Sequence, residues 1–155
     1  MKTVTVKEIV EAPVDQVWAS WDDFGAVARF HPGIKASRLM DGSAQSGIGA
    51  SRQCDLSANG KQFVREKIVS YDPPHRMVID IFEATVPIRS AQATLTLTPR
   101  VGNMTLVTMT MQFTPGMGLI GRLMSPMMAS QFRSMLGKVL KSNADYVTKG
   151  TEIAH

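Results

Sequence analysis

The chain has 155 residues, of which 44% are hydrophobic and 19% are charged, and its formal net charge is +4. These proportions fit one globular domain with a substantial core and exclude an intrinsically disordered chain. A single cysteine excludes an internal disulfide, and since no run of about 18 apolar residues is present we expect no membrane-spanning helix.

The N-terminus goes straight into an alternating pattern and lacks the apolar core of a signal peptide, so we expect a cytoplasmic protein. Cys54 lies within an apolar strand face, so we expect it to be a small buried residue. Basic residues are spread from Lys2 to Lys149 without forming a tract, and aromatic residues make up only 6% of the chain. This distribution favours a solvated surface, and we expect no nucleic-acid partner. The three histidines and the cysteine lack metal-ligand spacing, so we expect no metal.

The first part of the chain is predicted to form one strand and two short helices. Residues 1–11 alternate between apolar and polar side chains, which is typical of a strand. After Pro13, apolar residues recur at the spacing of a short helix: Val14, Val17, Trp18 and Trp21. A second helical segment is expected at about residues 24–29, before a turn at His31-Pro32-Gly33.

Six further strands are predicted between residues 34 and 113, separated by turn residues. They are expected at residues 34–40, 48–57, 63–71, 76–86, 89–98 and 104–113. Asn59-Gly60 is a strong signal for a tight hairpin turn between two of them. Consecutive strands joined by short turns are antiparallel, so we expect an antiparallel sheet.

The last long stretch predicts an amphipathic helix. Its apolar residues recur at helical spacing: Ile120, Leu123, Met124, Met127, Met128, Phe132, Met135, Leu136, Val139 and Val147. Ser125 as N-cap and Pro126 at the first helical position predict a helix over residues 126–148, roughly 34 Å long, with residues 116–124 as a loop or short helical lead-in. A helix of this kind is stable only when its apolar side is covered.

We therefore predict an α+β helix-grip fold, in which a curved seven-stranded antiparallel sheet wraps around the long C-terminal helix and two short helices follow the first strand. One domain is expected over residues 1–150, with a tail at 151–155. Such a fold leaves a cavity between helix and sheet unless side chains fill it.

The chain also resembles the START-like, helix-grip superfamily, most closely its polyketide cyclase/dehydrase-like and lipid-transport-like branch, which includes relatives of the birch pollen allergen. The residues that carry the resemblance span nearly the whole chain: residues 11–18, 22–24, 30–33, 66–68, 71–76, 95–99 and 113–115. One departure is Phe30, where the family usually has tryptophan. The resemblance implies a scaffold with a cavity for a small hydrophobic or amphipathic ligand, and no shared catalytic residues.

Charged residues interrupt the apolar faces of several predicted strands: Arg52, Glu66, Asp80 and Arg89. They are candidate ligand-binding residues or outward surface charges. A charge on the cavity side is costly unless it is paired, and Arg52 with Glu66 could form such a pair. In relatives, the position that matches Glu66 often faces the cavity.

The pairing of Arg52 with Glu66 depends on the turn between their strands. A two-residue Asn59-Gly60 turn would place Gln53 opposite Glu66 and would turn Arg52 to the other face. A longer loop or a bulge would restore the pair.

Methionine is concentrated late in the chain, with eight of the 11 methionines between Met104 and Met135. Because methionine is flexible and polarizable, these residues can fill a core or form the adaptable wall of a pocket. We expect a ligand-binding wall that includes Met109, Met111, Met124, Met128 and Phe132.

Residues 116–121 match the G-x-G-x-x-G pattern of dinucleotide-binding loops. That site needs a following strand, and here none is predicted. We therefore interpret the segment as a helix entrance and expect no cofactor. His31 is either a turn residue or a general base, and no catalytic residue is assigned.

Three functions remain open from the sequence. The first is binding or transport of a small hydrophobic or amphipathic ligand in the cavity. The second is a polyketide cyclase/dehydratase-type or isomerase-type enzyme that uses polar cavity residues. The third is a protein-interaction module with an exposed apolar patch.

Overall fold

The computed structural model describes residues 1–116 and 118–155. Met117 and the side chains of Ile120, which was predicted to be part of the apolar stripe, and of Ser125, the predicted N-cap, lie outside the described residues. Within the described part no helix is both long and apolar enough to cross a lipid bilayer.

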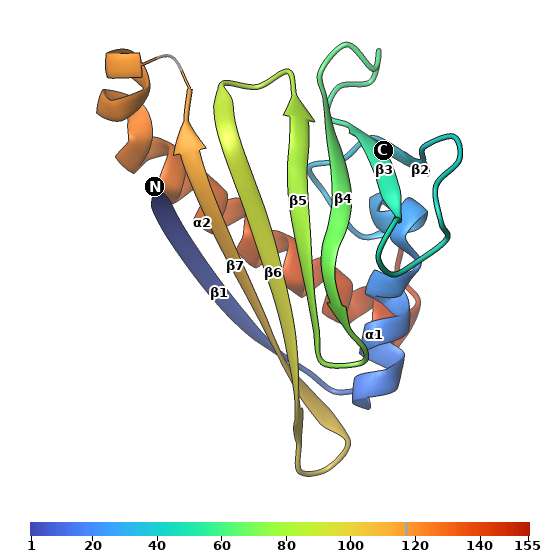
Figure 1. The fold of residues 1–155 in the computed structure, drawn as a ribbon. Coiled ribbons are helices and arrows are strands. Elements are labelled where there is room, and N and C mark those ends of the chain that lie inside the picture. Colours follow the sequence, from blue (N-terminus) through green and yellow to red (C-terminus); the bar gives the residue numbers. More distant parts are fainter. Residues whose placement is uncertain (117) are drawn as a thin grey trace.

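Seven strands form one antiparallel sheet in the order β1-β7-β6-β5-β4-β3-β2. Their bounds are β1 Lys2–Val10, β2 Ala36–Leu39, β3 Ser51–Asp55, β4 Phe63–Asp72, β5 Arg76–Ala84, β6 Ile88–Arg100 and β7 Met104–Pro115. Figure 1 shows the long helix α2, Gly118–Lys149, running diagonally across one face of this sheet. The predicted helix-grip architecture is confirmed.

The first and last strands lie side by side because their apolar residues match in register. Val4 faces Met111 across the β1–β7 ladder, and Val6 faces Met109. Residues of alternate parity on these strands point toward α2, as the two-residue period of a strand requires. The inner face therefore presents a continuous apolar surface to the helix.

The two short helices close one end of the grip. Helix α1, Val14–Asp22, buries Val17, Trp18 and Trp21, as predicted from their spacing, and the 3₁₀ helix η1 covers Phe24–Arg29. The indole N–H of Trp21 donates to the Asn143 Oδ1 of α2 over 3.1 Å, and the Asn143 amide donates to Ser20 Oγ over 2.9 Å. These hydrogen bonds satisfy a buried amide and fix α1 against the C-terminal half of α2.

Of the two alternatives for the turn at Asn59-Gly60, the longer loop is formed and the two-residue turn is not. Residues 56–62 connect β3 to β4, and the Leu56 N–H donates to the Gln62 carbonyl over 2.7 Å. The Asn59 side chain accepts hydrogen bonds within this loop, which local Asn-Gly propensity alone does not foresee. The longer loop places Arg52 directly opposite Glu66 in the β3–β4 register.

Helix α2 begins at Gly118, so the predicted start at Ser125-Pro126 is wrong, and Pro126 lies inside the helix. The first turns pack very closely on the end of β7, where a Cβ atom on Gly121 would overlap the carbonyl oxygen of Gly116. Only glycine permits this approach. The glycines of the 116–121 segment thus let the chain enter the helix directly from the sheet.

The two halves of α2 are packed differently. In the C-terminal half Leu136, Val139 and Leu140 are buried in the core. In the N-terminal half Leu123 is 76% exposed and Met127 is 52% exposed, so the prediction of one continuous buried stripe is wrong there. In Figure 1 these first turns lie at the β1–β7 edge of the sheet, next to the end of β7.

This asymmetry predicts that truncating two leucines of α2 changes the free energy of unfolding by very different amounts. Leu140→Ala should lower the free energy of unfolding by about 2–5 kcal/mol, because it removes fully buried methyl groups and leaves a cavity. Leu123→Ala should change it by less than about 0.5 kcal/mol, because Leu123 faces solvent. Urea unfolding of both variants measures the difference, and equal destabilisation would contradict the described packing.

Candidate functional site

A cavity of about 580 Å³ lies between α2 and the sheet. This is within the usual size of small-molecule sites. Most of the described residues that line it are apolar or glycine, and the polar side chains among them are those of His31, Glu66 and Gln131. The helix and the sheet thus border a partly open apolar space with a small polar region.

The walls of the cavity come from both sides of the grip. The sheet contributes Val64, Ile81, Ile88 and Met111, and α2 contributes Met124, Met128, Phe132 and Met135. The Phe132 ring meets Phe113 of β7 edge to face, with ring centroids 4.7 Å apart. Among the predicted ligand-binding residues, Glu66, Met111, Met124, Met128 and Phe132 therefore come together around this space.

The structure places the other predicted residues elsewhere. Met109 is buried in the core beside Leu95. Asp80 lies between Lys67 and Gln92 in the ladder and accepts a hydrogen bond from Gln92, on the outer face of the sheet. β5 pairs regularly from Ile79 to Ile81, so Asp80 points to the face opposite that of its two neighbours and away from α2.

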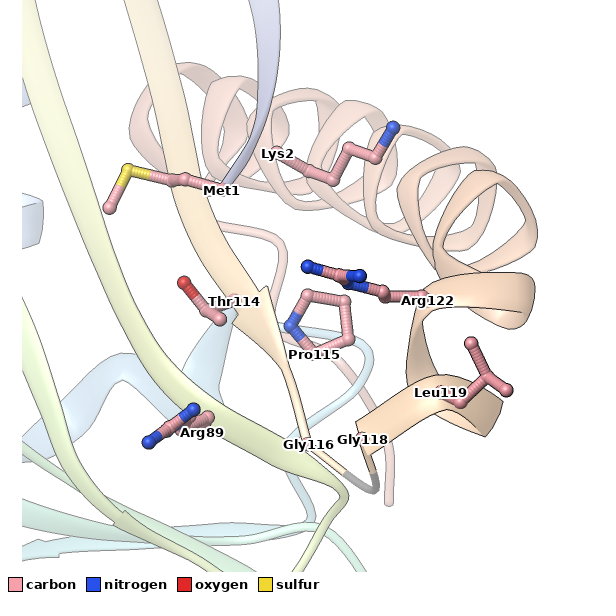
Figure 2. A pocket seen from close by; sticks show the side chains of 9 residues that line it. All are labelled: Met1, Lys2, Arg89, Thr114, Pro115, Gly116, Gly118, Leu119 and Arg122. Atoms are coloured by element: carbon pink, nitrogen blue, oxygen red, sulfur yellow. The ribbon is translucent and has the colours of Figure 1, made fainter.

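Arg89 is turned away from the cavity by an irregularity in the β6–β7 pairing between Ile88 and Ser90. Ile88 lines the apolar cavity, whereas Arg89 lines a separate surface hollow of about 1050 Å³. Figure 2 shows that hollow around Thr114 and Pro115 at the end of β7, with Lys2 and Arg122 on its other sides. No acidic side chain is among its described lining residues, so it is a basic surface hollow distinct from the apolar one.

Arg52 lies behind Glu66 and forms a buried ion pair with it. Its Nε donates to Glu66 Oε1 over 2.8 Å, and its Nη1 donates to the Phe24 carbonyl over 3.0 Å. The guanidinium also lies over the Phe24 ring, 3.9 Å from the ring centroid. The Cys54 thiol donates to the same Glu66 oxygen over 3.3 Å. Arg52 is thus a positioning residue for Glu66, and Cys54 is buried as predicted.

The ion pair keeps both groups charged in an apolar setting. Burial alone would raise the pKa of the Glu66 carboxyl, but the charge of Arg52 and the hydrogen bonds from Arg52 and Cys54 outweigh it, so this pKa lies below its ordinary value. Burial would likewise lower the pKa of Arg52, and the Glu66 carboxylate more than reverses that effect. Burial raises the pKa of the Cys54 thiol, which is therefore protonated and a donor.

His31 brings a neutral imidazole to the same end of the cavity. Its Nδ1 accepts a hydrogen bond from the Gly33 N–H over 3.0 Å, which fixes the ring within the His-Pro-Gly turn. Burial lowers the pKa of His31 to about 4, an effect that Glu66 opposes and Arg52 reinforces. At neutral pH the ring is uncharged, with its other nitrogen available as a donor.

Sequence reasoning missed most of the apolar lining, and it considered His31 only as a possible general base and not among the ligand-binding residues. Val64 could have been found, because it shares the parity of Glu66 on one strand. Ile34 and Val86 lie in loops, and Gln131 lies on a partly exposed face of α2. No periodic sequence pattern identifies these three residues as part of a cavity wall. Within residues 1–116 and 118–155, no three His, Cys, Asp or Glu side chains gather as a metal site would require.

The buried pair predicts a strong effect of removing its cation. Arg52→Met should lower the free energy of unfolding at pH 7 by about 3–5 kcal/mol, because it leaves the Glu66 carboxylate buried without a counter-charge. The deficit should shrink as the pH is lowered, since a protonated Glu66 needs no cation. Urea unfolding at pH 7 and pH 4.5 measures this, and a deficit that does not change with pH would contradict it.

His31 predicts a pH dependence of stability in a defined window. Its pKa is about 4 in the folded chain against 6.5 for an ordinary histidine, so between these values the unfolded chain binds more protons. The free energy of unfolding should therefore fall by about 3 kcal/mol as the pH is lowered from 6.5 to 4. His31→Asn, whose side-chain oxygen can still accept from Gly33, should lack this part of the decline in urea titrations.

Comparison with known proteins supports this architecture. No curated protein matches the chain in sequence. Among solved structures, one from Thermobifida fusca is 25% identical with a TM-score of 0.72 and covers 100% of this chain and 99% of its own. A START superfamily protein from Mycobacterium smegmatis is 15% identical with a TM-score of 0.76, covering 94% of this chain and 99% of its own.

A further solved structure, the ZhuI aromatase/cyclase from Streptomyces sp. R1128, is 14% identical with a TM-score of 0.74, covering 98% of this chain and 99% of its own. These likenesses show a shared fold. The model of one family, described as polyketide cyclase / dehydrase and lipid transport, matches residues 1–148. The seven-stranded grip around α2 and this match over nearly the whole length show that the chain belongs to the polyketide cyclase / dehydrase and lipid transport family.

Proposed function

We propose that the protein binds or carries a small hydrophobic or amphipathic molecule in the cavity between α2 and the sheet. The observation that carries this proposal is an apolar space of about 580 Å³, open to solvent on one side and lined by few polar side chains. A core without a binding role would ordinarily be packed to the density of an organic crystal, with few voids larger than a water molecule.

The make-up of the walls supports an adaptable binding site. Met111, Met124, Met128 and Met135 line the space from two sides. Their unbranched side chains can change rotamer around apolar ligands of different shape. Met124 is 43% exposed, so this part of the wall lies at the opening of the cavity toward solvent.

A second candidate function is a polyketide cyclase/dehydratase-type enzyme. It is favoured by the ionised Glu66 and the neutral His31, which line the same cavity and could accept and donate a proton. Both observations also suit a polar contact to a bound ligand. Turnover would distinguish the two, since a carrier returns its ligand chemically unchanged.

Binding can be tested with the neutral fluorescent probe N-phenyl-1-naphthylamine. The unaltered protein should bind it, and Met128→Trp should weaken binding about 10-fold or more by filling the cavity. Leu123→Trp is the matched control, because it adds the same side chain to the solvent-facing side of the same helix and should leave the affinity nearly unchanged.

Mass spectrometry of an organic extract of the purified protein should in addition reveal a co-purifying apolar molecule. Failure of the unaltered protein to bind the probe, together with an extract free of any such molecule, would contradict the proposed function. Equal loss of binding in both tryptophan variants would show that the probe binds outside the cavity.

A further inference from the structure

We propose that the cavity selects neutral ligands that carry a hydroxyl group, which donates its proton to the Glu66 carboxylate and accepts a hydrogen bond from the Nε2–H of His31. This inference rests on the proposed binding function and names the chemical class of ligand. It follows from which polar atoms the protein itself satisfies at this end of the cavity and which it leaves available.

The Glu66 carboxylate has one oxygen used by the protein and one available. Oε1 accepts from both Arg52 and Cys54. In the described part of the chain Oε2 has no side-chain or backbone donor, and no buried side-chain nitrogen or oxygen there lacks a partner. Oε2 must therefore be accessible, and the space that Glu66 lines is the apolar cavity.

The same argument assigns a donor to His31. Because Nδ1 accepts from the Gly33 N–H, a neutral ring carries its proton on Nε2. Nε2 forms no hydrogen bond to the described residues. Because every buried side-chain nitrogen or oxygen in the described part has a partner, Nε2 is not fully buried. Nε2–H is thus a second accessible polar group, and His31 lines the cavity together with Glu66.

The available acceptor and the available donor line one cavity, and the two side chains are close enough for the Glu66 charge to act on the His31 ring. Together they are complementary to a hydroxyl, which both donates and accepts. An ether or ketone can only accept and would leave Oε2 without a proton donor. A carboxylate or phosphate would place a second negative charge against Glu66 in a space of low dielectric, which is strongly unfavourable. The rest of the ligand meets apolar walls, so the favoured class is an apolar alcohol or phenol.

Three probes of similar size separate these possibilities: 2-naphthol, 2-methoxynaphthalene and 2-naphthoate. Their affinities at pH 7.5 can be measured by displacement of N-phenyl-1-naphthylamine. We expect 2-naphthol to bind about 10-fold or more tighter than 2-methoxynaphthalene, since a hydrogen bond to a charged group is gained, and 2-naphthoate to bind weakest.

Two variants assign the preference to its residues. Glu66→Gln keeps an oxygen for Arg52 and should abolish the advantage of 2-naphthol over 2-methoxynaphthalene. His31→Asn keeps the acceptor for Gly33, removes the Nε2–H and should weaken both of these probes. Leu123→Ala, on the exposed side of α2, should leave the ranking unchanged. Urea unfolding checks that each variant is folded. If either Glu66→Gln or His31→Asn fails to fold, the other still tests the proposal.

The outcomes separate this inference from the proposed function. If 2-naphthol and 2-methoxynaphthalene bind the unaltered protein equally, and Glu66→Gln changes neither, the hydroxyl preference is wrong while the binding function stands. If 2-naphthoate binds tightest, the polar end recognises anions and the inference is overturned. If none of the three probes nor N-phenyl-1-naphthylamine binds, it is the proposed function that fails.

Discussion

The buried ion pair between Arg52 and Glu66 is the interaction on which the chemistry of this cavity depends. A carboxylate in an apolar space would ordinarily take up a proton, but Arg52 stabilises the charge from behind and leaves the second oxygen facing the cavity. Arg52 is in turn held by the Phe24 carbonyl and ring, so η1 takes part in positioning a charge that lies on β4. A polar end is thereby built into an otherwise apolar site without leaving any described buried polar atom unsatisfied.

This arrangement depends on a loop rather than on the strands that carry the charges. Residues 56–62 set the register that places Arg52 opposite Glu66, and a shift by one residue would turn one of the two charges to the other face of the sheet. The irregularity in the β6–β7 pairing near Ile88 has a similar effect, since it directs Ile88 into the cavity and Arg89 out of it. Small departures from regular pairing thus decide which charges the cavity contains.

The sequence predicted seven antiparallel strands, the short helices and the grip because these follow from periodicity and turn residues, which are local signals. Its errors are at places where local signals conflict with tertiary contacts. Pro126 resembles a helix start, yet the helix begins at Gly118, where Gly121 packs on the Gly116 backbone. Glu66 and several methionines of the cavity could be predicted from the periodicity of their own elements. The sequence offered His31 only as a possible general base and could not place it with Glu66, because its position follows from a turn that folds against distant strands.

The unequal packing of α2 has a consequence for motion. Its C-terminal half is held by buried leucine and valine side chains and by the Trp21–Asn143 hydrogen bond, while its first turns bury little apolar surface. Regions with few buried contacts open locally at a lower free energy than the core, so backbone amides near residues 118–131 should exchange with deuterium well before those near residues 136–147. We therefore expect the cavity to open by local unfolding of the helix near Met124 and Met128, so that a ligand could enter while the sheet stays folded.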